Sequence, residues 1–297
     1  MKKGFIVLIV IGAIFTTAGA VLFGIGLSKE FKIAKSVTNE HVLTDTFEKV
    51  NIDIDTADLK FYKSTDGLNK VVCVEKEKQY HVVSVSDNTL SITSKDDLNW
   101  YERAFTFNPG KMEVNIYLSE SSYDSLNIKS STGDIAMPEG FTYRVSDIKL
   151  STGDVYFSSQ VSEALNIKTS TGDIHLDKLD SNGASVTLEC DTGKKYIESV
   201  HANKISMTSS TGRNNISNST FNEDMYIKSS TGNVNIVSSD AATVNIETST
   251  GDVNATFLTG KSVTTETRTG DISVIPSTGG ACHIKTTTGD ITVGYKG

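Results

Sequence analysis

Cysteine is scarce in this sequence, and its three residues, Cys73, Cys190 and Cys282, stand far apart without a CxxC pair. This spacing indicates neither a zinc site nor a disulfide framework, so we expect three unpaired and mostly buried thiols. Proline is equally rare, with three residues, which argues against a proline-rich stalk. Serine, threonine and glycine are abundant instead, a composition typical of many strands joined by tight turns.

Positive charge is also in deficit, because 28 Lys and Arg residues face 36 Asp and Glu residues and leave a formal net charge of −8. Duplex binding needs clustered cations that replace counterions along the phosphates, so we expect no nucleic-acid partner. Hydrophobic residues make up 37% of the chain, too few for a protein with many membrane spans. The bulk of the chain is therefore expected to fold in water.

One long apolar run stands at the N-terminus. Residues 4–27 carry no charge, and a helix of this length reaches roughly 36 Å, enough for a hydrocarbon core of about 30 Å. The sequence predicts a cytoplasmic stub (1–3), one transmembrane helix (4–27), a linker (28–44) and an extracytoplasmic remainder, an orientation that Lys2 and Lys3 favour. A cleaved signal peptide is the alternative, because Ala18-Gly19-Ala20 resembles a cleavage site.

A Thr-Gly pair recurs at intervals of 19–21 residues. Its nine glycines are Gly133, Gly153, Gly172, Gly193, Gly212, Gly232, Gly251, Gly270 and Gly289. An even period of this length indicates a solenoid, in which each coil buries its apolar face only by stacking on its neighbours. Glycine suits the turn because a residue at positive φ would place a Cβ in a clash.

Apolar residues keep fixed distances from the repeat glycine. Five positions before it eight of nine residues are apolar, with Thr265 the exception, and four positions after it all nine are apolar. Positions seven before and two after extend the alternation in most units, and a third apolar point follows in the return segment, at Phe141, Val161, Leu179, Val200, Phe221 and Leu258. The chain is therefore predicted to be all-β, with a single-stranded-coil β-solenoid of about nine rungs over residues 126–297.

Residues 45–125 alternate in strand-like runs and predict a β-rich head or cap before the solenoid. Within them, Asp55-Thr56-Ala57-Asp58 looks like a degenerate rung with Ala57 at the glycine position. At the other end only seven residues follow Asp290. An open solenoid end exposes unpaired edge groups, so we expect self-association or a partner at the C-terminal edge.

The segments Leu126-Asn-Ile-Lys-Ser-Ser-Thr-Gly-Asp-Ile135 and Val244-Asn-Ile-Glu-Thr-Ser-Thr-Gly-Asp-Val253 resemble the toast-rack β-strand repeat family of bacterial domains of unknown function, which also carries an adhesin label. The likeness covers roughly residues 45–295. The resemblance implies a β-solenoid at the cell envelope, membrane-anchored in some members and sometimes encoded beside membrane-stress regulators. It implies no catalytic residues.

The residue after each repeat glycine is Asp in six units, and stacked carboxylates could bind Ca²⁺ or simply be good turn residues. The Asp column is interrupted in the middle of the repeat by a group of cationic and amide residues, Lys194, Lys195, Arg213, Asn214 and Asn215. This group is predicted to be a patch that either binds an anionic envelope polymer or relieves like-charge repulsion along the column.

No catalytic, cofactor-binding or metal-ligating residues are predicted, because the five histidines are scattered and their spacing suggests no pairing with a carboxylate or nucleophile. We therefore expect a non-enzymatic scaffold or binding protein, tethered to the membrane and facing the cell envelope, with envelope polymers or membrane regulatory proteins as partners. A β-helix enzyme acting on cell-wall or extracellular glycan is one alternative. An accessory protein of membrane-stress signalling is the other.

Overall fold

The computed structural model describes residues 35–100, 102 and 110–296. The predicted stub, the predicted transmembrane helix and residues 28–34 of the linker lie outside the described residues. Across those described ranges, no helix combines the length and the apolar character needed to cross a bilayer. Strand β1 (Ser36–Leu43) lies within the segment 28–44 that was predicted as a linker.

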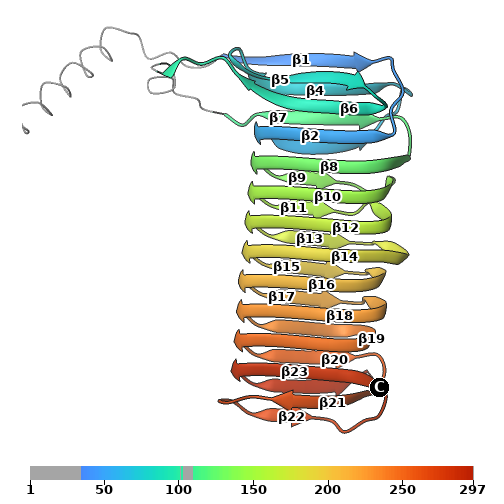
Figure 1. The fold of residues 1–297 in the computed structure, drawn as a ribbon, viewed down its shortest axis with the longest axis vertical. Helices are drawn as coiled ribbons and strands as arrows, with labels where there is room; N and C mark the ends of the chain where they lie inside the picture. The colour runs from blue at the N-terminus through green and yellow to red at the C-terminus, as the bar shows by residue number, and fades with distance from the viewer. Residues whose placement is uncertain (1–34, 101, 103–109, 297) are drawn as a thin grey trace, which may run out of the picture.

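Parallel strands stack into a rod with two sheet faces (Figure 1). The long strands of one face are β8 (Ser122–Thr132), β10 (Thr142–Thr152), β12 (Gln160–Thr171), β14 (Asp180–Thr192), β16 (His201–Thr211) and β18 (Thr220–Thr231). The short strands of the other face are β9 (Ile135–Met137), β11 (Val155–Phe157), β13 (Ile174–Asp177), β15 (Lys195–Glu198) and β17 (Asn214–Ser217). Strand β19 (Val234–Thr250) contributes to both faces and is followed by β20 (Val253–Phe257). The predicted β-solenoid of about nine turns is confirmed.

The repeat glycines stack directly on one another at the turn from the long to the short strand. Their φ angles lie between +128° and +151°. A Cβ added at any of the nine would lie only 1.8–2.3 Å from the carbonyl oxygen of the stacked neighbour, which is another repeat glycine in eight cases and Ala57 beneath Gly133. Glycine is thus required twice, by the backbone angle and by the close approach of the adjacent rung.

The predicted apolar columns fill the space between the two faces. All apolar residues five positions before the glycine are buried, and the return-segment side chains from Phe141 to Phe221 are buried too. Leu258 was predicted to continue this last column, but it is 37% exposed, and its neighbour Phe257 takes the inward position. The columns form one continuous hydrophobic core.

The N-terminal head extends the solenoid by two further rungs. Strands β2 (Lys49–Thr56) and β3 (Asp58–Lys63) pair in parallel with β8 and β9, and Thr56 aligns with Thr132, so the degenerate rung at Ala57 is confirmed. Strands β6 (Thr89–Asp96) and β7 (Glu113–Leu118) stack on β2 and β3 in turn. Antiparallel pairing of β1, β4 (Asn69–Lys76) and β5 (Gln79–Ser86) then closes this end.

At the C-terminal end the rungs do not stack in chain order. Strands β23 (Gly280–Thr288) and β24 (Ile291–Tyr295) lie between β19–β20 and the earlier strands β21 (Lys261–Glu266) and β22 (Ile272–Val274). The glycines follow the same order, since Gly289 stacks on Gly251 and Gly270 stacks on Gly289. The rung that ends the rod is therefore the eighth repeat, which explains why Thr265 interrupts the apolar column and why Ile272 is 49% exposed.

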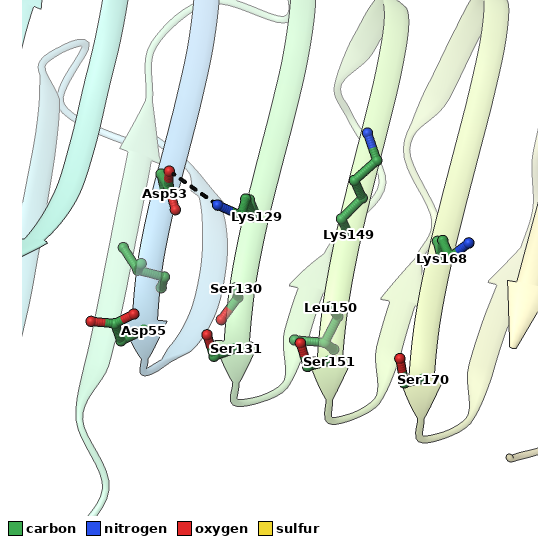
Figure 2. Close-up of a pocket in the computed structure, with 11 residues that line it drawn as sticks. Asp53, Asp55, Lys129, Ser130, Ser131, Lys149, Leu150, Ser151, Lys168 and Ser170 are labelled. Carbon is green, nitrogen blue, oxygen red and sulfur yellow. Dashed lines mark ion pairs between the residues drawn. The ribbon is translucent and has the colours of Figure 1, made fainter. Parts of the chain in front are cut away.

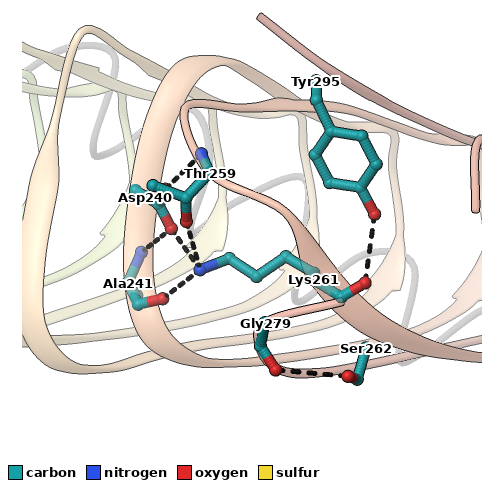
Figure 3. A network of polar contacts seen from close by, with 7 residues as sticks. All are labelled: Asp240, Ala241, Thr259, Lys261, Ser262, Gly279 and Tyr295. Atoms are coloured by element: carbon teal, nitrogen blue, oxygen red, sulfur yellow. Dashed lines mark hydrogen bonds and ion pairs between the residues drawn. The ribbon is translucent and has the colours of Figure 1, made fainter. Parts of the chain in front are cut away.

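A buried ion pair fixes the segment that leads to this displaced rung (Figure 3). Lys261 Nζ contacts the carboxylate of Asp240 and donates a hydrogen bond to Ala241 O at 2.6 Å. The second oxygen of Asp240 accepts a bond from Thr259 N at 2.7 Å, and Tyr295 OH donates to Lys261 O at 3.3 Å. The network ties β19, β21 and β24 together at the place where the chain leaves sequential order.

We predict that Gly212→Ala destabilises the rod far more than Gly140→Ala. Both glycines have positive φ, +145° and +98°, but a Cβ at Gly212 would lie 1.8 Å from Gly193 O, whereas one at Gly140 meets nothing within 4 Å. The control substitution should cost about 1 kcal/mol of backbone strain. Gly212→Ala should cost several times more, measured as the drop in thermal unfolding midpoint, and equal losses would contradict the stacking explanation.

Candidate functional site

The five residues of the predicted patch do not share one surface. Lys194 and Arg213 follow the turn glycines of neighbouring rungs and are exposed. Lys195 and Asn214 come one residue later and point into the core. Asn215 lies on the outer side of β17, where its Oδ1 accepts an amide hydrogen bond from the next rung at 3.0 Å. The predicted patch is wrong as a single surface, because strand alternation sends its members to opposite sides.

Lys195 and Asn214 form a buried polar pair in the middle of the rod. Lys195 is 0% exposed and stacks between Ile174 and Asn214. Its Nζ has no hydrogen-bond partner, and burial lowers the pKa of Lys195 to about 8. Asn214 Nδ2 donates to Ser209 Oγ at 3.4 Å, while its Oδ1 has no partner. Unpaired polar groups in an apolar core are costly, so this pair lowers the stability of the rod.

The sequence contains a signal for this burial. The position two after the glycine is Ile or Val in the other seven units, so the period alone places residues 195 and 214 on the inward side. The surface interpretation followed the chemical type of the residues instead of the strand alternation.

The aspartates after the turn glycines accept hydrogen bonds from the backbone of the next rung. Asp134 Oδ1 accepts a hydrogen bond from Asp154 N at 2.9 Å, and Asp154 Oδ1 accepts one from Asp173 N at 2.7 Å. Asp173 Oδ1 accepts one from Lys194 N at 2.7 Å in the same way. One oxygen of each carboxylate thus satisfies a backbone donor, which explains the Asp column as part of the scaffold.

A shallow groove of about 290 Å³ crosses the outer side of β2, β8, β10 and β12 (Figure 2). Its lining includes a lysine on each of three successive rungs, Lys129, Lys149 and Lys168, and the serines that precede the turns. Each lysine has an ion-pair partner: Asp53 at 3.7 Å, Asp147 at 2.9 Å and Glu189 at 2.7 Å, respectively. These exposed pairs add little stability, and they neutralise the groove locally.

An aromatic ladder runs along the opposite face. Tyr156, His175 and Tyr196 stack with ring centroids 4.6 Å and 4.7 Å apart and interplanar angles of 15°. All three residues stand three positions after a turn glycine, a signal that the sequence analysis did not use. Because the rings cover one another's faces, the ladder offers mainly hydroxyl and imidazole edges to a ligand.

The cap contains a cluster that the sequence analysis did not find. Cys73 and Glu75 on β4 and His81 on β5 are buried, with donor atoms all within 4.8 Å of one another. Glu75 Oε2 lies 2.9 Å from His81 Nδ1 and accepts a hydrogen bond from His81 N at 2.7 Å. The spacing of the histidines in the sequence had suggested no such pair. Alternation along β4 was the missed signal, since it places Val71, Cys73 and Glu75 on one side.

This cluster does not suit nucleophilic catalysis on an external substrate. Cys73 is 0% exposed, and burial raises the pKa of its thiol to about 12. A catalytic cysteine needs an accessible thiolate. Cys190 and Cys282 are also free and buried, as predicted.

We predict that Lys195→Met stabilises the protein, by about 2–3 kcal/mol at pH 7. Below its folded pKa of about 8, Lys195 is a buried cation. Between that value and about 10.4 only the unfolded chain keeps the proton, so the free energy of unfolding of the parent protein rises with pH. Between pH 7 and pH 9.5, the rise in thermal unfolding midpoint should be smaller for Lys195→Met than for the parent protein. The exposed neighbour substitution Lys194→Met should leave it unchanged, and an identical response of both variants would contradict the burial argument.

Comparison with solved structures gives matches at low identity. A putative adhesin from Bacteroides fragilis NCTC 9343 is 15% identical over 87% of this chain and 97% of its own, with a TM-score of 0.40. Two proteins from Parabacteroides distasonis ATCC 8503 are described as a putative adhesin and a putative lipid binding protein. The first is 13% identical over 87% of this chain and 97% of its own, with a TM-score of 0.43. The second is 14% identical over 89% and 97%, with a TM-score of 0.41.

A search of curated proteins finds no match. The family model described as Toastrack DUF4097 matches residues 47–297, which confirms the resemblance seen in the repeat motif. The chain therefore belongs to the Toastrack family.

Proposed function

We propose that this protein is a non-catalytic binding rod, tethered to the membrane by residues 4–27 and presented to the cell envelope. The uncharged N-terminal run and the preceding Lys2 and Lys3 support the tether. Membership of the Toastrack family and the repeated surface ladders support a scaffold role. The burial of Cys73, Glu75 and His81 weighs against the glycan-enzyme alternative, and an accessory role in membrane-stress signalling stays a prediction.

The proposed binding role rests on two exposed cations, Lys194 and Arg213. They occupy equivalent positions on neighbouring rungs, about 4.8 Å apart at the backbone, where the Asp column is interrupted. Neither forms an ion pair with another described residue, in contrast to the groove lysines. Two exposed cations without an ion pair to another described residue fit, at this spacing, successive anionic groups of an extended polymer, and Arg adds a bidentate hydrogen-bonding fork.

We predict that the double variant Lys194→Ser/Arg213→Ser loses most binding to cell walls that carry an anionic polymer such as teichoic acid. The matched control is Lys228→Ser/Lys285→Ser, which removes the same charge from two exposed lysines paired with Glu247 and Glu266. Co-sedimentation with intact walls and with walls stripped of the polymer measures the effect. Equal binding of the two double variants to intact walls would contradict this assignment. So would binding of the parent protein to stripped walls that equals its binding to intact walls.

A second contact surface is proposed at the free end of the rod. Among the described residues, the last rung pairs on one side only, β21 with β23 and β22 with β24. Ile272 and Ile275 there are 49% and 58% exposed. The combination of unpaired backbone groups and exposed apolar side chains supports self-association of two rod ends, because edge-to-edge pairing would satisfy both.

We predict that Ile272→Lys/Ile275→Lys shifts the protein to the monomer, because charges at an edge oppose strand pairing. The control is Val237→Lys on the flank of the rod, where Val237 is 53% exposed. Sedimentation velocity over a range of protein concentrations distinguishes them. A parent protein that stays monomeric throughout would rule out association at this end.

A further inference from the structure

We propose that Cys73, Glu75 and His81 bind a zinc-class metal ion within the N-terminal cap. The three side chains offer thiolate, carboxylate and imidazole ligands, the set that Zn²⁺ uses in proteins. This site is separate from the surface cations and from the rod end.

The geometry brings the donors close to coordination distance. Their donor atoms all lie within 4.8 Å of one another. Ligands of a tetrahedral zinc ion, at 2.0–2.3 Å from the metal, stand about 3.5 Å apart. Small side-chain movements are therefore enough to close the donors around one ion.

The local strand structure explains why these residues converge. Cys73 and Glu75 are two residues apart on β4 and share its inward side, and a short turn at Glu77 and Lys78 returns the chain along β5 to His81. Asn39 of β1 pairs with Cys73 in the antiparallel register and donates from its Nδ2 to Glu75 Oε1 at 2.6 Å. The carboxylate is thereby held in place from outside the cluster, as outer hydrogen bonds hold the ligands of metal sites.

The imidazole of His81 meets Glu75 through one nitrogen and leaves the other without a partner. His81 is 2% exposed, and its Nε2 is buried without a hydrogen-bond partner. A structural hydrogen-bond network accounts for Nδ1 and for Glu75, but it leaves Nε2 unsatisfied, which is costly in a buried site. An ion held by Glu75 would take Nδ1, the nitrogen that faces the carboxylate, in place of the hydrogen bond between them, and the imidazole would keep its proton on Nε2. The thiol of Cys73 supplies a further ligand with affinity for such an ion.

The test uses the full-length protein, stripped with a chelator and titrated with Co²⁺, which reports thiolate ligation by a charge-transfer absorption band in the near ultraviolet. We expect one equivalent of Co²⁺ to give this band and Zn²⁺ to abolish it. Cys73→Ser should remove the band, whereas Cys190→Ser and Cys282→Ser should keep it, since those free thiols lie buried elsewhere in the solenoid. Glu75→Gln and His81→Gln should weaken Co²⁺ binding at least tenfold.

A labelling experiment on the parent protein avoids variants that fail to fold. With a thiol reagent under mild denaturant, Zn²⁺ should slow modification of Cys73 relative to Cys190 and Cys282, as mapped by mass spectrometry. Absence of stoichiometric Co²⁺ binding, a band that persists in folded Cys73→Ser, or equal protection of the three thiols would each overturn the proposal and leave a structural hydrogen-bond network only.

Discussion

The close stacking of one turn glycine on the next is the contact on which the rest of this molecule depends. Each repeat glycine lies so close to the carbonyl oxygen of the adjacent rung that there is no room for a Cβ. This approach keeps the rungs in register, so that the same column of side chains meets itself along the whole rod. The aspartate after the glycine adds a hydrogen bond to the next rung at the same corner. The strand register, the apolar columns of the core and the ladders on the surface all depend on the stacking of these turns.

A molecule built this way separates inward from outward positions strictly, and its exceptions are informative. Lys195 and Asn214 place unsatisfied polar atoms in an otherwise aliphatic column. By contrast, Lys261 is also buried but is paired with Asp240 and hydrogen-bonded to the backbone, so its charge is compensated where that of Lys195 is not. The cost of burying a lysine in this core therefore depends on whether a carboxylate partner is within reach.

Periodicity made the fold predictable, because one residue type was forced at every turn and the apolar columns kept their distance from it. The degenerate rung at Ala57 could be found for the same reason. Periodicity could not reveal that the last repeat inserts before the eighth, since both have the same pattern and only Thr265 marks the exposed end. Periodicity could not predict the cap cluster either, because Cys73 and His81 are brought together by an antiparallel turn outside the repeat. Lys195 could have been placed correctly, had alternation been given priority over charge.

The inserted final rung also sets an order of events during folding. Strands β21 and β22 precede β23 and β24 in the chain, yet they rest on them in the finished rod. While the chain emerges from its N-terminus, the solenoid can grow rung upon rung only as far as β20, and the next coil has to wait for residues 280–295. Placement of β21 and β22 on the rod therefore requires residues 280–295, so a chain that lacks them would have β19 and β20 as its last ordered rung.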